Sequence, residues 1–265
     1  MASIFNVWIW LAIPIGLAAL IYGGGPLLIL LIFKNEAQPT LQPFEPSDQS
    51  LPLLVREHFK NACDELMPLG FEYIAGMRLP QMTDNVMAIM IMLVNRSAGD
   101  AAAAISIYAK SDEVWDLQTS YVEYSTSFRS GVTVNTQNST AISAFPPLAE
   151  CKNYRFSSIR DARQLYQVHE RLLSEQNASP KLMRLDEEYD GDAVAFVRAV
   201  LHREMVGAAS DGYLYLTADS KYFRATLKGA YLMTWQELCP IKQIRRSSRD
   251  RQARQQLVEL GFPSK

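Results

Sequence analysis

The pattern of apolar and polar positions begins with an uncharged, apolar segment over residues 4–33. About 20 apolar residues are enough for a helix to cross a bilayer, and this segment is longer. A single spanning segment must satisfy its backbone polar groups internally, which favours a helix. Trp8 and Trp10 stand where interfacial aromatic residues are common, and Lys34 follows the apolar residues. The pattern therefore predicts a transmembrane helix over residues 4–33, with the lipid bilayer as its partner.

Proline and glycine residues inside this segment affect its expected shape. Pro14 removes a backbone donor, and the GGGP sequence at residues 23–26 loosens a helix, so we expect a kink or a weakened helix near residue 24. A re-entrant hairpin turning at the glycines would leave only residues 27–33 to cross back, which is too few. A cleaved signal peptide would have a basic start and a shorter apolar stretch. A single span fits these features best.

The residues that follow the span predict a tether and an orientation. Residues 34–52 contain four prolines, a spacing that helices cannot accommodate, so an extended and semi-rigid linker is expected. No basic residue precedes the span, whereas Lys34, Arg56 and Lys60 follow it. The excess of basic residues on one side predicts that the rest of the chain is cytoplasmic.

Residues 53–180 predict an α+β domain. Apolar residues at helical spacing over residues 53–67 indicate an amphipathic helix, and a second apolar stripe runs from Ile159 to Leu173. Between them the period changes to that of strands, at residues 71–79, 86–94, 101–108, 120–128 and 132–138. The order helix, five strands, helix predicts an antiparallel five-stranded meander flanked by helices, with the helices on one face.

Residues 181–265 predict a helical extension with a short β-hairpin and a basic tail. Asp192 can cap a helix over residues 193–205. Residues 213–217 and 222–227 form a candidate hairpin, and a further helix is expected over residues 229–238. A final helix runs through residues 257–260 and stops at Gly261.

Charge and cysteine content narrow the function classes. The formal net charge is −2, which gives no global electrostatic argument for nucleic acid. The three cysteines, Cys63, Cys151 and Cys239, are widely spaced and odd in number, which does not suggest a disulfide framework.

The sequence contains no catalytic, nucleotide-binding or metal-binding signature, so we predict no cofactor. None of the three histidines has a ligand partner at zinc spacing, and His169 lies on an apolar helix stripe, typical of a hydrogen-bonded core histidine. Residues 186–192 (DEEYDGD) partly mimic a calcium loop. The twelfth position is Val197, which cannot supply the bidentate carboxylate, so we expect a solvated linker and a helix cap instead.

Residues 242–254 form a basic run with six cationic side chains and one acid, Asp250. One interpretation is contact with an anionic membrane surface. A second is binding to nucleic-acid phosphate, and a third is a solvated helix face. The candidate membrane-contacting residues are Lys242, Arg245, Arg246 and Arg249.

The order helix, helix, hairpin over residues 159–228 resembles a winged-helix module, with residues 222–229 (YFRATLKG) similar to the strand that closes its wing. The resemblance covers about a quarter of the chain. It implies that the helix over residues 193–205 would read the major groove. That helix offers only Arg198 and Arg203, beside Glu204, which is little charge for a DNA reader.

Together these patterns predict a membrane-tethered domain that binds a protein partner or a ligand without catalysis. The alternatives are a tethered enzyme whose site has no sequence signature, and a membrane-bound DNA-binding regulator. A cavity would favour a ligand, whereas a solid core with an exposed apolar patch would favour a protein partner. A deep pocket holding a carboxylate with a strongly shifted pKa would favour an enzyme.

Overall fold

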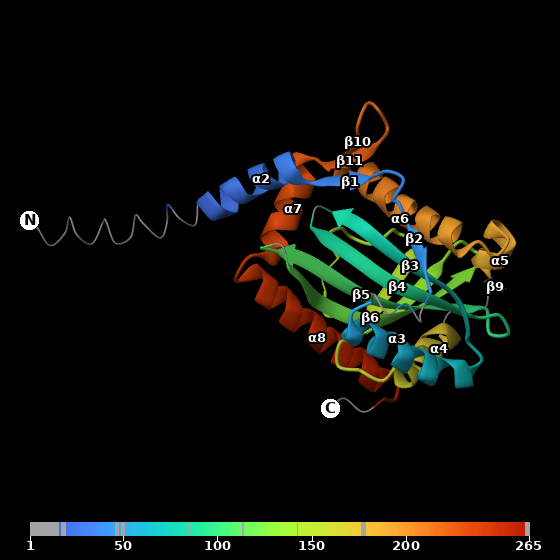
Figure 1. Ribbon diagram of the computed structural model, residues 1–265. Helices are drawn as coiled ribbons and strands as arrows, with labels where there is room; N and C mark the ends of the chain where they lie inside the picture. Colours follow the sequence, from blue (N-terminus) through green and yellow to red (C-terminus); the bar gives the residue numbers. More distant parts are fainter. Residues whose placement is uncertain are drawn as a thin grey trace, which may run out of the picture.

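The structure, a computed structural model, is a mixed α+β fold in which several helices surround a multi-stranded sheet (Figure 1). It describes residues 16, 20–45, 48, 51–83, 85–112, 114–141, 143–175 and 179–262. Half of the predicted transmembrane helix, residues 4–15 and 17–19, lies outside the described residues. Within the described ranges, no helix combines the length and apolar character needed to cross a bilayer.

The described end of the apolar segment is helical and packs against the C-terminal part of the chain. The weakening expected near residue 24 takes the form of a π-helical turn, η1 (Leu20–Gly24), which continues into α2 (Gly25–Ile32). Helix α2 lies against α7 (Leu227–Glu237), as Figure 1 shows. The approach is close at Gly25, where an added Cβ would lie 2.7 Å from Cγ2 of Thr234. Several large apolar side chains of α2 are exposed: Leu27, Leu28, Leu31 and Ile32.

The main sheet contains the predicted meander and extends beyond it. In spatial order its strands are β2 (Gln42–Phe44), β3 (Glu72–Thr83), β4 (Val86–Asn95), β5 (Asp100–Ser111), β6 (Val114–Phe128), β7 (Thr133–Gln137) and β8 (Cys151–Arg155). The five predicted strands correspond to β3–β7, which are antiparallel neighbours. Strand β8 pairs in parallel with β7, and β9 (Lys181–Leu182) pairs with the end of β6.

The predicted linker, residues 34–52, contributes two short strands to sheets. Strand β1 (Lys34–Glu36) pairs with β11 (Tyr222–Ala225), and β2 pairs with β3. The two pairings hold the start of the linker against the domain. The linker therefore acts as part of the fold rather than as a spacer that separates the domain from the apolar helix.

Helices cover both faces of the main sheet, whereas the sequence pattern predicted one covered face. Helices α3 (Leu53–Leu66) and α4 (Ala162–Ser174) pack on one face, with Phe59 and Leu165 in the core. Helices α5 (Arg184–Tyr189) and α6 (Ala193–Ser210) pack on the other. The reason lies in β4, which is apolar at consecutive positions and buried from Ile89 onward. A strand that is apolar on both sides needs a helical layer on each.

The C-terminal region is integrated with the rest of the chain. Strands β10 (Leu214–Leu216) and β11 complete a three-stranded sheet with β1. Helix α8 (Ile241–Glu259) includes the basic run and ends in the main core, where Ala253 and Leu257 are buried. The expected separate last helix is therefore the final part of α8. The predicted cap of α6 is present, because the Asp192 carboxylate accepts a hydrogen bond from Ala195 N at 2.9 Å.

Candidate functional site

A pocket of about 610 Å³ lies beside strand β8, at the edge of the main sheet. Its walls come from β8 and the residues on either side of it, from helix α7 and from helix α8. Its lining is mainly cationic and hydroxyl-bearing: Lys152, Arg155, Arg245, Arg246, Arg249, Ser139, Thr140, Ser143 and Ser157. Asp250 is the one acidic residue of that lining. Elements far apart in sequence thus bring five cations to one cavity.

Helix α8 presents three of these cations because of its periodicity. Arg245 and Arg249 are four residues apart and Arg246 and Arg249 three apart, so they share one side of the helix. The buried positions Ala253 and Leu257 fix the rotation of α8 by packing into the main core. That rotation directs the arginines toward β8, whose Lys152 and Arg155 complete the basic lining.

Hydrogen bonds hold some of the lining side chains in place. The Gln236 side chain on α7 is buried, and its Nε2 donates to Ala144 O at 2.6 Å. Its Oε1 accepts from Arg245 Nη1 at 2.8 Å. Arg155 Nη2 donates to Ser143 Oγ at 3.3 Å. The pocket is therefore partly pre-organised by neutral groups.

The arginines that α8 brings to the pocket lie close to other cations. In the described part of the chain, no salt bridge involves Arg245, Arg246 or Arg249. Partial burial lowers the pKa of Arg249, and the like charges of Arg155 and Arg245 lower it further. Asp250 accepts a hydrogen bond from Ser157 Oγ at 3.3 Å. An anion in the pocket would relieve this repulsion.

The structure separates the four basic residues that the sequence singled out. Arg245, Arg246 and Arg249 line the pocket together. Lys242 does not, and its Nζ pairs with Glu237 at 2.7 Å on the exposed surface. Sequence reasoning missed Lys152 and Arg155, because β8 is short and polar and was not predicted. The only signal was a pair of basic residues three apart in residues 151–155.

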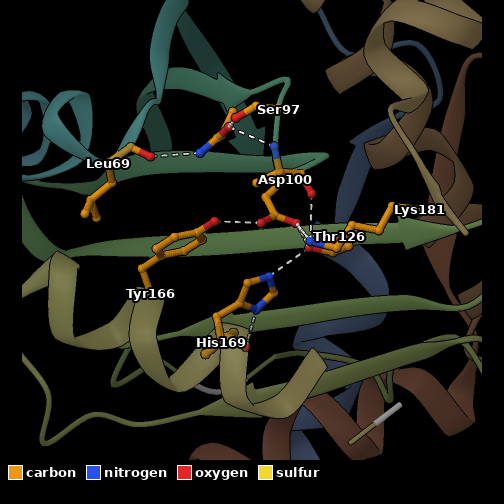
Figure 2. Close-up of polar contacts among 10 residues, drawn as sticks. Leu69, Ser97, Asp100, Thr126, Tyr166, His169 and Lys181 are labelled. Atoms are coloured by element: carbon orange, nitrogen blue, oxygen red, sulfur yellow. Dashed lines mark hydrogen bonds and ion pairs between the residues drawn. The ribbon is translucent and has the colours of Figure 1, made fainter. Parts of the chain in front are cut away.

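A second polar cluster lies in the main core and centres on Asp100 (Figure 2). The fully buried carboxylate accepts hydrogen bonds from Thr126 Oγ1 at 2.6 Å and Tyr166 Oη at 2.7 Å. Lys181 Nζ forms an ion pair with it at 2.7 Å and also donates to Ala98 O. Strands β5, β6 and β9 and helix α4 are thereby joined through one carboxylate.

His169 continues this cluster and is the hydrogen-bonded core histidine that its helix stripe indicated. Its Nε2 lies 2.9 Å from Thr126 Oγ1, and its Nδ1 lies 2.8 Å from Thr136 Oγ1. Because Thr126 donates its proton to Asp100, the ring must donate from Nε2 and accept at Nδ1. Burial lowers the pKa of His169 to about 4. Asp100, Thr126 and His169 are all 0% exposed, so a substrate cannot reach them and the cluster is structural.

Glu123 is a carboxylate with a shifted pKa, the feature that would favour an enzyme if the carboxylate lay in a deep pocket. Burial, and to a smaller extent the neighbouring Glu204, raise its pKa to about 7, while Arg155 opposes the rise. Glu123 stands on β6 and is absent from the pocket lining. The shifted carboxylate therefore lies outside the pocket lining, although it interacts electrostatically with Arg155, which is part of that lining.

The acidic residues 186–190 lie mostly in α5, where three of them are paired with arginines. Arg96 binds Asp186 at 2.9 Å, Arg129 binds Glu187 at 2.5 Å, and Arg184 binds Glu188 at 2.8 Å. Among the described residues, no group of three or more His, Cys, Asp or Glu side chains is placed to hold a metal ion.

Helix α6, the candidate DNA reader, is enclosed by the fold. Val197 and Leu201 pack toward the main sheet, while Met205 and Ala208 pack toward the small one. Arg198 Nε donates to Pro39 O at 3.4 Å. This packing gives no support to a basic face that could enter a groove.

The fold and the site define a class of protein: an α+β domain with an apolar helix at one end and a cationic pocket at the edge of its main sheet. Comparison of the chain with protein-family models, curated proteins and solved structures finds no match. The function is therefore argued from the residues of the site.

Proposed function

We propose that this chain is a single-pass membrane protein whose α+β domain binds a phosphate-bearing ligand in the basic pocket, without catalysis. The observation that carries the proposal is the charge of the pocket, where five cations and one carboxylate line about 610 Å³. Arginine favours phosphate because its planar guanidinium can donate two parallel hydrogen bonds to phosphate oxygens. A cavity of this kind supports a ligand over a protein partner as the occupant.

The membrane anchor in this proposal is the segment of residues 4–33. The exposed apolar side chains of η1 and α2, such as Leu20 and Leu31, support it, because water disfavours such a surface. The basic residues after the segment support a cytoplasmic domain. Centrifugation of the detergent-free, full-length protein tests the anchor, and recovery in the supernatant would contradict it. A C-terminal reporter that is active only after export tests the orientation, and its activity would refute the cytoplasmic placement.

Ligand binding is tested with inorganic pyrophosphate as the probe and the full-length protein in a neutral detergent. The double variant Arg246→Gln/Arg249→Gln removes two pocket charges. Its matched control is Arg251→Gln/Arg254→Gln, which removes two exposed charges of α8 outside the pocket lining. At constant ionic strength, calorimetry should show binding roughly a hundredfold weaker or more for the pocket variant, because each of the two lost charged hydrogen bonds contributes about 1.5–3 kcal/mol. Binding should stay near wild type for the control. Equal weakening in both, or no binding by the wild type, would refute the pocket as the site.

A further inference from the structure

The pocket and the anchor helix are separated by a single helix, α7. Thr234 on one side of α7 meets Gly25 of the apolar segment, and Leu232 and Gln236 on the opposite side line the pocket. Trp235 lies between these two sides, and its Nε1 donates to Tyr22 O at 3.0 Å. A helix with its side chains is about 10 Å across. The basic pocket therefore lies about one helix diameter from the segment that we propose enters the bilayer.

Exposed apolar side chains continue from α2 across this end of the molecule. In α2, Leu27 and Leu31 are 58% and 74% exposed. Trp235 on α7 is 42% exposed, and Ile244, which directly precedes Arg245 on α8, is 64% exposed. Figure 1 shows α2, α7 and the start of α8 at the same end of the molecule. Tryptophan and aliphatic side chains beside arginines are typical of a surface at the membrane interface.

We infer that the ligand of the basic pocket is the phosphate headgroup of an anionic phospholipid in the membrane that holds the anchor. The inference rests on the proposed function and identifies the source of the phosphate. The apolar residues Trp235 and Ile244 contact the acyl boundary, while the arginines beside them meet the headgroup layer. Arg246 and Arg249 bind the headgroup phosphate of a lipid that inserts between α8 and β8, and Lys152 on β8 contacts it from the opposite wall.

Reconstitution of the full-length protein into lipid nanodiscs tests this inference. One set of discs contains phosphatidylcholine alone, and the other also contains phosphatidic acid. Hydrogen–deuterium exchange is followed in residues 241–250 and 151–155, and the bound lipid is identified by native mass spectrometry. The same exchange measurement is made in neutral detergent with inorganic pyrophosphate. Arg246→Gln/Arg249→Gln is compared with its control, Arg251→Gln/Arg254→Gln, after near-ultraviolet circular dichroism has established that both are folded.

The expected result is that phosphatidic acid slows exchange in both segments and is retained by the wild type and the control. Retention by the pocket variant should fall roughly tenfold or more, given about a fivefold effect for each basic residue near an anionic surface. If phosphatidic acid affects both double variants alike, the contact is general surface attraction and the inference is wrong. If pyrophosphate protects the pocket but phosphatidic acid does not, the ligand is soluble: the inference fails and the proposed function stands. If neither probe protects it, both are refuted.

Discussion

Acid should destabilise this protein through one buried ring, that of His169. In the native state burial keeps the ring neutral, with a pKa lowered from 6.5 to about 4. The unfolded chain binds a proton at this residue below about pH 6.5, so it takes up more protons than the native state as the pH falls. Stability contributed by the neutral ring is fully present above pH 6.5 and is lost progressively down to about pH 4.

The size of the effect follows from the shift in pKa. Each unit corresponds to 1.36 kcal/mol, so the full difference of about 2.5 units amounts to roughly 3 kcal/mol. At about pH 5 most of it, roughly 2 kcal/mol, has been lost. For a protein of this size that corresponds to a fall in the melting temperature of about 4–8 °C relative to neutral pH.

The assay is thermal unfolding of the full-length protein in neutral detergent, from about pH 7.5 to pH 5. The comparison is His169→Gln, whose amide can still bond to Thr126 but does not titrate. Burial also lowers the pKa of His58, so the wild type carries a second acid-sensitive ring that the variant retains. The variant should be less stable at neutral pH, yet its melting temperature should fall by several degrees less on acidification. Parallel pH profiles of the two proteins would refute the reasoning.

Three further substitutions test the packing of the fold. Asp100→Asn removes the charge on which two hydroxyl donors and an ion pair converge, and should lower the free energy of unfolding by about 3 kcal/mol in a urea titration. A loss below about 1 kcal/mol would show that the carboxylate is not the hub of the cluster. Gly25→Ala should place its methyl group against Thr234 and destabilise by about 1–3 kcal/mol, and a second change, Thr234→Ala, should restore the melting temperature. Failure of that rescue would contradict the close approach of α2 and α7. Leu257→Ala should cost about 2–5 kcal/mol, whereas Val258→Ala at the adjacent exposed position should change little, and equal effects would mean that α8 does not pack into the main core.

The central sheet was predictable because its information is local. Strands β3–β7 alternate or run continuously apolar, and their turns contain residues that tolerate a positive φ, such as Asn85 at 62° and Gly99 at 74°. Neighbouring strands in sequence are neighbours in space, so a local pattern suffices. The second helical layer was missed even though the continuous run in β4 indicated two buried faces, because the helices that cover the second face come about 90 residues later.

The short strands at the edges were not predictable, because their pairing depends on residues that are far away in the sequence. Lys34 pairs with Arg224, and β8 joins β7 in parallel across a proline-containing loop. Their side chains carry little periodicity, because edge strands are short and partly solvated. The pocket could not be predicted for the same reason, because it depends on packing between segments that are far apart in the sequence. The sequence identified the arginines of α8 as a charge run, but the direction in which they point depends on how α8 packs beside β8.

The two polar clusters of this protein differ in a way that assigns them different roles. In the core cluster the Asp100 carboxylate and the His169 ring are fully buried, and both have hydrogen-bonding partners within the chain. A buried network whose polar groups are paired in this way rigidifies the fold and leaves no hydrogen-bonding group of the carboxylate or the ring for a ligand. The pocket has the opposite arrangement, because like charges on α8 and β8 face one another and lower the pKa of Arg249. Such an arrangement lowers stability in the absence of a ligand, since Glu237 offsets the effects of burial and of the neighbouring cations on Arg249 only in part. A bound anion supplies the remaining compensation, which is why the pocket rather than the core cluster is the functional site we propose.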